Sequence, residues 1–296
     1  MMNKFKKLSI STIIIYSILI LISLTVLVPL LHLLAMSLSD PLKVHKLSGL
    51  GIIPEGFSLI NYKILLSNPL IIKSIFNTLF ITIVGTAVNL LLTAMTAYVL
   101  ARTKFPGRNF VMIFLIVIMV FEPGLIPEYL LVKNLGLLDT YASLILYKTI
   151  NIFYLFIMMR FFEDVPESIL EAARMDGAGH FRIFTKIMLP LSKPALATMG
   201  LFYGVYHWNE YFRATIYLTD TGKWPLQLVL RQFVVERDNT SLLGAQNFLS
   251  YDQIATLDFA SLQAGTIIIS VVPLLLIYPL ILKYYAKGAF EGGVKD

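Results

Sequence analysis

Long apolar runs restrict what this chain can fold into more than any other feature. The first run extends from Ile10 to Met36 without a single Asp, Glu, Lys or Arg. About 20 apolar residues are enough for a helix to cross a hydrocarbon layer of roughly 30 Å. Charged residues make up only 14% of the chain, far below the roughly one quarter that is usual in soluble domains. We therefore expect a helical membrane protein.

The hydropathy pattern predicts six membrane spans. They are residues 10–36, 72–100, 110–132, 141–160, 195–218 and 264–285. The first span follows the basic segment MMNKFKK, but its apolar run is about twice as long as the 7–15 residues of a signal-peptide core, and it lacks a clear cleavage site. It is interpreted as an uncleaved span. The predicted fold class is therefore all-α, with six transmembrane helices in one transmembrane domain that comprises residues 1–296.

The distribution of Lys and Arg predicts the orientation. With the N-terminus inside, the cytoplasmic segments hold 14 of the 24 basic residues, although they are shorter in total than the outer segments, which include 37–71 and 219–263. Positive residues accumulate on the cytoplasmic side of membrane proteins. We expect a multi-pass protein of the plasma membrane with both termini in the cytoplasm, and the formal charge of +6 needs no nucleic-acid partner.

Motifs for chemistry are missing from the sequence. It contains no GxxxxGK[ST] phosphate loop, no HExxH and no GxSxG, and its four histidines are scattered. Cysteine is absent, which excludes a disulfide framework and thiolate metal sites. We expect no catalytic residue, no metal site and no bound cofactor, so a conduit or a binding surface is left.

The segment 163–194 stands out because it is polar and lies between two apolar spans, on the predicted cytoplasmic side. Pro166 suits the start of a helix, and Gly177 suits the left-handed residue that ends one. Apolar residues then recur at helical spacing, which predicts a second helix at the membrane interface that ends at Pro190 and Pro194. A compact, capped projection of this kind suits docking to another protein; a mere amphipathic connector is the simpler alternative.

The stretch EAARMDGA, followed by LPLSKP, resembles the EAA loop of permease subunits in binding-protein-dependent ABC importers. In that family the loop is a coupling helix that sits in a cleft of the ATPase subunit and links ATP-driven closure to alternating access. The resemblance implies the following ATPase-coupling residues: Glu171, Ala172, Ala173, Asp176, Gly177 and Ala178.

The resemblance extends over nearly the whole chain. The segments 125–146, 161–173, 201–218 and 224–232 are similar to the maltose-permease-like carbohydrate subgroup, and in particular to its polysaccharide and oligosaccharide branch with lipoprotein-like names. The tail 287–296 is similar to that branch except at Glu291. The resemblance implies a type I importer fold in a bacterial cytoplasmic membrane. The implied partners are a second, homologous permease, an extracellular solute-binding lipoprotein and two ATPase subunits, which use ATP and Mg²⁺.

Polar residues on the fifth span predict where a substrate passes. A charge near the bilayer centre costs at least about 2.5–3.5 kcal/mol, so such residues should face a wet or protein-lined path. Tyrosine and tryptophan can stack on sugar rings, and Arg213, Arg231 and Arg237 would suit an acidic oligosaccharide. Mutual pairing at a helix interface is the alternative, and Glu210 is close enough to Arg213 for it. The predicted pathway residues are Glu122, Tyr203, Tyr206, His207, Trp208, Asn209, Glu210 and Arg213.

Three other functions fit the sequence less well. A permease for a non-sugar solute would keep the EAA loop but not the aromatic WNEYF stretch (residues 208–212). A self-sufficient secondary transporter should show repeated halves and broken helices with midplane charges, and no internal repeat is evident. A membrane enzyme would need a recognisable catalytic motif.

Overall fold

The computed structural model describes residues 10–102, 106–236 and 258–291. Within these ranges the chain is helical, apart from an isolated bridge between Ser39 and Phe57. Some features named above lie outside the described residues: Arg237, the polar stretch 238–247, the basic N-terminal segment and the end of the tail, 292–296. The elements are α1 (Ile10–Ser37), η1 (Val44–Lys46), α2 (Ile60–Ser67), α3 (Pro69–Arg102), α4 (Arg108–Val120), α5 (Leu125–Asn134), α6 (Ala142–Ile145), α7 (Ile152–Glu163), α8 (Glu167–Met175), α9 (His180–Ile183), η2 (Phe184–Met188), α10 (Leu189–Leu191), α11 (Lys193–Trp208), α12 (Phe212–Tyr217), η3 (Thr221–Lys223), α13 (Leu226–Val234) and α16 (Phe259–Glu291).

The chain divides into two compact units, residues 1–69 with 233–272 and residues 70–232 with 273–296. In the first unit, the buried Asn61 side chain fastens the end of α1. Its amide donates to the carbonyl oxygen of Ser37 at 3.0 Å, and its own oxygen accepts from Ser261. The first of these bonds satisfies a carbonyl that the end of a helix leaves free. The side chains of α1 up to Leu31 are mostly exposed, as expected for a helix whose solvent is lipid.

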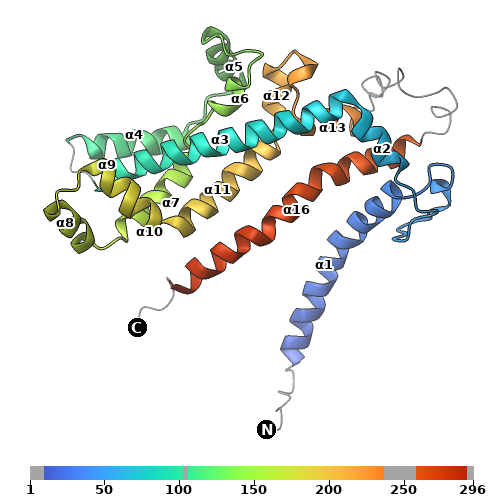
Figure 1. Cartoon of the computed structure of the whole chain (residues 1–296), viewed down its shortest axis with the longest axis horizontal. Helices are drawn as coiled ribbons and strands as arrows, with labels where there is room; N and C mark the ends of the chain where they lie inside the picture. Colours follow the sequence, from blue (N-terminus) through green and yellow to red (C-terminus); the bar gives the residue numbers. More distant parts are fainter. Residues whose placement is uncertain (1–9, 103–105, 237–257, 292–296) are drawn as a thin grey trace, which may run out of the picture. The chain divides into compact units, whose positions relative to one another are not determined.

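The second unit is built on α3, which lies beside α11 (Figure 1). Tyr203 of α11 and Thr93 of α3 share a buried hydrogen bond of 2.8 Å. One apolar core, around Met158, Phe162 and Met199, lies toward the end of α3 and includes Leu170 of α8. A second core, around Ile81 and Leu144, lies toward the beginning of α3 and includes residues of α12 and α13. Each end of α3 therefore has its own apolar core, one with α8 and the other with α12 and α13.

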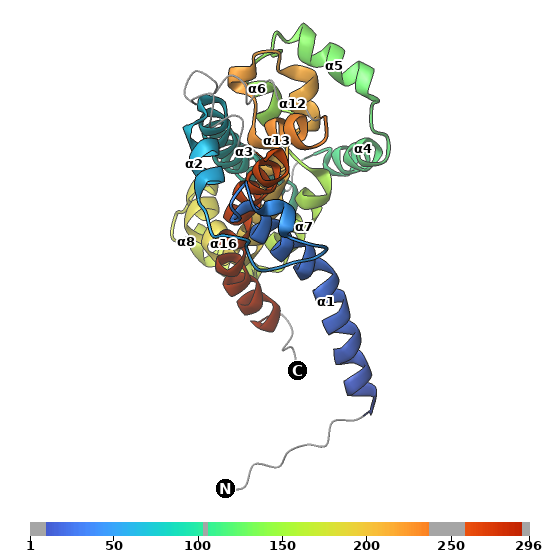
Figure 2. The same cartoon turned by 90° about the vertical axis from the view of Figure 1, so that its right-hand side faces the viewer.

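Three of the six expected spans are not continuous helices. Residues 110–132 divide at Phe121–Gly124 into α4 and α5, which meet at 117° (Figure 2). Pro123 explains this break, because proline removes a backbone donor and disfavours a helical conformation of the preceding residue. The expected span 141–160 divides at 146–151, where Lys148 has φ 47°. The expected span 195–218 divides at Asn209–Tyr211.

Helix length therefore limits which segments can span a membrane alone. Within the described residues, three helices are long and apolar enough: α1, α3 and the segment Phe259–Pro279 of α16. A fourth span results if the bent pair α4 and α5 counts as one. By contrast, α11 has 16 residues and α7 has 12, which correspond to about 24 Å and 18 Å.

The helix expected after Gly179 forms, and it ends at Leu191, between the two prolines that were expected to end it. The chain continues from α9 through η2, which is a π-helical turn, into α10. Pro190 lacks the amide that would bond four residues back, so the helix loses a hydrogen bond close to its end. Pro194 lies in the first turn of α11, where a missing amide costs little.

Candidate functional site

The structure confirms a short, capped helix in the EAA segment. Pro166 directly precedes α8, and Gly177 has φ 76° just after its end. The Gly177 amide donates to Arg174 O at 3.0 Å, and the Ala178 amide donates to Ala173 O at 2.9 Å. This pair of bonds is a Schellman motif, which satisfies the last carbonyls of a helix. A Cβ at position 177 would meet nothing within 4 Å, so the backbone conformation, and not space, requires glycine there.

One face of α8 packs on the core of the second unit, and the other face is exposed. Leu170 is fully buried in the core, with Ala173 and Ala178 half-buried against it. The other predicted coupling residues, Glu171, Ala172, Asp176 and Gly177, are exposed. Exposed apolar side chains accompany them, since Met175 is 88% and Phe181 78% exposed. The arrangement presents a rigid helix face to the surroundings.

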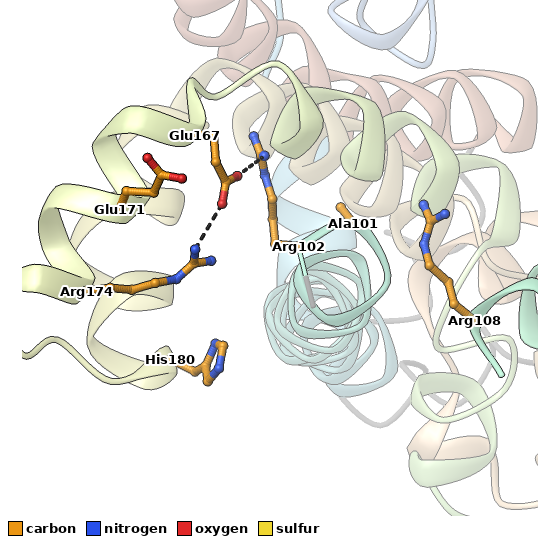
Figure 3. A pocket seen from close by; sticks show the side chains of 7 residues that line it. All are labelled: Ala101, Arg102, Arg108, Glu167, Glu171, Arg174 and His180. Carbon is orange, nitrogen blue, oxygen red and sulfur yellow. Dashed lines mark hydrogen bonds and ion pairs between the residues drawn. The ribbon is translucent and has the colours of Figure 1, made fainter. Parts of the chain in front are cut away.

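A charged cleft of about 790 Å³ lies between α8 and the end of α3. Figure 3 shows Glu167 reaching toward two arginines: Arg102 Nη1 lies 3.1 Å from Glu167 Oε2, and Arg174 Nη1 lies 3.0 Å from Glu167 Oε1. His180 Nδ1 lies 3.1 Å from the hydroxyl of Tyr98. The cleft is lined by Ala101, Arg102, Arg108, Glu167, Glu171, Arg174 and His180.

Sequence reasoning missed most of this cleft. Of its lining residues, only Glu171 was predicted to have a role in coupling. The arginines at positions 102, 108 and 174 were expected only to set the orientation of the chain in the membrane. For Arg102 and Arg108 the available signal was their place beside the ends of apolar segments, where a guanidinium can reach free helix carbonyls.

A second cleft, of about 580 Å³, opens where the third, fourth and fifth expected spans break. The breaks bring together polar side chains that continuous helices would have kept apart. Five predicted pathway residues line it, with three further polar residues that were not predicted. The predicted ones are Glu122, Tyr206, Asn209, Glu210 and Arg213, and the others are Glu128, Tyr147 and Lys148.

Arg213 is the centre of this second cleft. Its guanidinium lies 4.7 Å from the ring centroids of both Tyr147 and Tyr206. It forms an ion pair with Glu210 in which both side chains are buried. Glu210 Oε1 also accepts the Arg213 amide at 3.0 Å, one of the amides that the start of α12 leaves free. Arg213 Nη1 is buried and has no hydrogen-bond acceptor among the described residues.

The remaining charges of the second cleft are more exposed. Lys148 Nζ lies 2.9 Å from Glu122 Oε1, across two of the helix breaks. Glu128 is the hydrogen-bond partner of Tyr147. Three carboxylates and two cations therefore surround this space, and the buried arginine is already neutralised by Glu210.

Three predicted pathway residues lie in packed surroundings and not in the cleft. The hydroxyl of Tyr203 bonds to Thr93 and accepts the Asn151 amide at 3.1 Å. His207 is fully buried against Gly85 of α3, and Trp208 is 3% exposed. At these three positions the structure favours helix packing. Across residues 10–102, 106–236 and 258–291, no group of three or more His, Asp and Glu side chains could hold a metal ion.

The chain is similar in sequence to permease proteins. A family model described as "binding-protein-dependent transport system inner membrane component" matches residues 94–289. The polygalacturonan/rhamnogalacturonan transport system permease protein YtcP of Bacillus subtilis (strain 168) is 40% identical over 282 residues, which cover 95% of this chain and 96% of YtcP. Protein LplC of the same organism is 41% identical over 269 residues, which cover 90% of this chain and 88% of LplC. The diacetylchitobiose uptake system permease protein NgcG of Streptomyces coelicolor is 31% identical, over 94% of this chain and 87% of NgcG.

A solved structure matches the fold as well. The crystal structure of a bacterial ABC transporter involved in the import of the acidic polysaccharide alginate superimposes with a TM-score of 0.85 and 30% identity, over 96% of this chain and 100% of that chain. The fold is thus that of a type I ABC permease, which is a transport component and not an enzyme. The chain belongs to the family of binding-protein-dependent transport system inner membrane components.

Proposed function

We propose that this chain is one of two permease subunits in an ATP-driven importer that moves oligosaccharides or polysaccharide fragments into the cytoplasm by alternating access. The observation that carries the proposal is α8, a capped helix with one face buried in the core and the other face exposed. Two ATPase subunits would hydrolyse ATP with Mg²⁺. A second, homologous permease and an extracellular solute-binding lipoprotein would complete the assembly.

The exposed face of α8 is the proposed contact with the ATPase. It combines alanine, which permits close approach, with apolar Met175 and the carboxylate of Glu171. That carboxylate makes no ion pair with any described residue. A cation of the partner could therefore pair with it at little cost. Asp176, Gly177 and Ala178 would set the angle at which the chain leaves this contact.

In this proposal the end of α3 that carries α8 faces the cytoplasm, and both termini do so too. The six predicted spans are kept as crossings, with three of them broken inside the bilayer. Broken helices are tolerated at membrane depth where protein or a water-filled cavity surrounds the free backbone groups. The cleft around Arg213 is such a place, so the breaks support a pathway through it.

The second cleft is the proposed sugar contact in this subunit. Tyr147 and Tyr206 provide aromatic faces, and Arg213 Nη1 provides a buried donor that has no acceptor among the described residues. A sugar hydroxyl or carboxylate would satisfy this donor. The relatives named for polygalacturonan/rhamnogalacturonan and diacetylchitobiose, and the importer of alginate, support a carbohydrate. A gradient-driven transporter has no ATPase subunit that the exposed face of α8 could contact.

The proposal is tested by purifying the chain with its co-expressed partners and reconstituting the complex in proteoliposomes. We expect a second permease and an ATPase to copurify, and the loaded binding protein to stimulate both ATP hydrolysis and oligosaccharide uptake. Gly177→Pro should leave the complex in the membrane but abolish the stimulation. A chain that purifies alone, or a Gly177→Pro complex with normal stimulation, would contradict the assignment of α8.

A further inference from the structure

The last residue of α3, Arg102, makes an unusual set of contacts with its single guanidinium. Nε lies 2.7 Å from Phe162 O, and Nη2 lies 3.0 Å from Glu163 O. Nη2 also donates to Val165 O, in the three-residue connection before α8. Nη1 lies 3.1 Å from Glu167 Oε2, in the first turn of α8. The side chain is only 11% exposed, so water competes little for these contacts.

These contacts need arginine in particular. Phe162 and Glu163 are the last two residues of α7, and their carbonyl oxygens belong to the group that a helix end leaves free. Arginine carries five N–H donors in a fixed plane, whereas lysine has three donors on one nitrogen. A lysine could reach some of the four oxygens, but it could not hold the end of α7 and the start of α8 at the same time.

The same contacts connect α8 to the rest of the second unit. Beyond the Arg102 contacts, α8 is fixed to the core through buried Leu170 and half-buried Ala173. In turn α3 meets α11 without free space, since a Cβ at Gly85 would lie 2.5 Å from His207 Nε2. The helix α11 then ends beside the second cleft, to which it contributes Tyr206. A displacement of α8 therefore has a rigid route to that cleft, and Arg102 is its first link.

We propose that Arg102 is a positioning residue for coupling: it transmits the displacement of α8 to α3. This inference rests on the proposed function, because it assumes that an ATPase moves α8. The proposed role of Arg102 differs in one measurable consequence from the role of a residue that only caps the end of a helix. Loss of a cap lowers the amount of folded protein, whereas loss of the link lowers the number of sugars moved per ATP by the protein that does fold.

The test uses the complete importer with Arg102→Gln and Arg102→Lys. Arg160→Gln is the matched control, because Arg160 is exposed and its ion pairs with described residues are those with Glu163 and Asp164, at the end of its own helix. Uptake and ATP hydrolysis are measured on the same proteoliposomes. We expect Arg102→Gln to retain ATP hydrolysis but to lose about tenfold in uptake per ATP, the scale of losing hydrogen bonds to a charged group. The uptake per ATP of Arg102→Lys should lie between that of Arg102→Gln and that of the unmodified protein. Arg160→Gln should have the same uptake per ATP as the unmodified protein. An unchanged ratio in Arg102→Gln would overturn the inference.

A spectroscopic readout covers the case in which Arg102→Gln does not assemble. The chain contains no cysteine, so Ser168→Cys on α8 and Met95→Cys on α3, both exposed, can carry spin labels in a complex with cysteine-free partners. We expect a narrow distance distribution in the unmodified chain and in Arg160→Gln, and a broader one in Arg102→Lys. An equally narrow distribution in Arg102→Lys, with an unchanged uptake ratio, would overturn the inference.

Failure of this inference can be told apart from failure of the proposed function. If Gly177→Pro uncouples the importer and Arg102→Gln does not, α8 is the coupling helix but Arg102 is not its link to α3. If Gly177→Pro retains full stimulation, the assignment of α8 itself is wrong.

Discussion

Lys223 Nζ lies 2.7 Å from Asp139 Oδ2 and 2.8 Å from the carbonyl oxygen of the same residue. The pair joins two connections that are 84 residues apart in the chain. Asp139 Oδ1 also accepts the amides of Thr219 and Asp220, and the residue has φ 56°. The hydrogen bond from Lys223 and those from the two amides lower the pKa of Asp139 to about 2. This cluster holds the connection after α5 against the one after α12.

The first prediction concerns pH. Because the pKa of Asp139 falls below its ordinary value of 3.8 on folding, its charge stabilises the folded state above that value, and this contribution is lost as the pH falls toward about 2. We expect Asp139→Asn to lower the apparent melting temperature of the detergent-solubilised protein at pH 7 but not near pH 2. The control is Asp164→Asn, whose carboxylate is exposed and lies 3.6 Å from Arg160. If Asp139→Asn lowered the melting temperature equally at both pH values, the charge of Asp139 would not be the source of the stabilisation.

The second prediction concerns the contact of α3 with α11. A Cβ at Gly85 would lie 2.5–2.8 Å from three atoms of the buried His207 ring, whereas a Cβ at Gly204 would lie 3.7 Å from Thr86 Oγ1, an ordinary contact. Gly85→Ala should therefore cost about 1–3 kcal/mol through overpacking, and Gly204→Ala should cost much less. Thermal unfolding of the two purified variants checks this. Equal stability would mean that His207 moves aside freely.

The third prediction separates backbone conformation from space at the end of α8. Gly177 has φ 76°, and Gly179 has φ −72°, yet neither would place a Cβ near another atom. An L-residue in the left-handed region costs roughly 1–2 kcal/mol, so Gly177→Ala should weaken the cap and reduce binding-protein-stimulated ATP hydrolysis. Gly179→Ala should leave it unchanged. Matching activities in the two variants would contradict a requirement for the left-handed turn.

The fourth prediction concerns the buried pair in the second cleft. Removing one partner of a buried ion pair leaves the other charge uncompensated, at a cost of about 3–5 kcal/mol. Arg213→Gln should therefore lose uptake of acidic and neutral oligosaccharides alike, largely through instability. Glu210→Gln with Arg213→Gln should recover much of the folded protein, as judged by size-exclusion chromatography. If Arg213 instead served only to bind acidic sugars, the Arg213→Gln variant would lose uptake of acidic oligosaccharides and keep uptake of neutral ones.

The fifth prediction assigns charge selectivity to Lys148. This cation lines the same cleft, is 41% exposed at its side chain and pairs with the exposed Glu122. An exposed pair contributes little to stability, so Lys148→Gln should fold normally. If an acidic sugar passes here, the variant should import galacturonate oligomers more slowly and neutral oligomers at the normal rate. Unchanged uptake of both would place any recognition of carboxylates elsewhere in the importer.

Some of the structure could be predicted from sequence because its causes are local. The apolar runs predicted a helical membrane protein, since the length needed to cross a bilayer is a property of one segment. Pro166 and Gly177 predicted the ends of α8 correctly, because helix caps depend on neighbouring residues. The pairing of Glu210 with Arg213, three residues apart, was foreseen as an alternative for the same reason. The resemblance of the EAA segment pointed to the correct family.

Other features were decided by contacts between distant residues. The divided third, fourth and fifth spans were not expected, because an apolar run does not show where the surrounding protein can satisfy a broken helix. Tyr203 was predicted to face a pathway, but its partners are Thr93 and Asn151, far away in the sequence. From the sequence, Arg102 was expected only to be a cytoplasmic loop charge. In the structure its guanidinium donates to carbonyl oxygens at the end of α7. The sequence by itself therefore determined the helical fold class, the cap of α8 and the family. The tertiary structure decided where the spans divide and which polar groups meet, since a buried donor takes whichever acceptor the packing of the helices brings within reach.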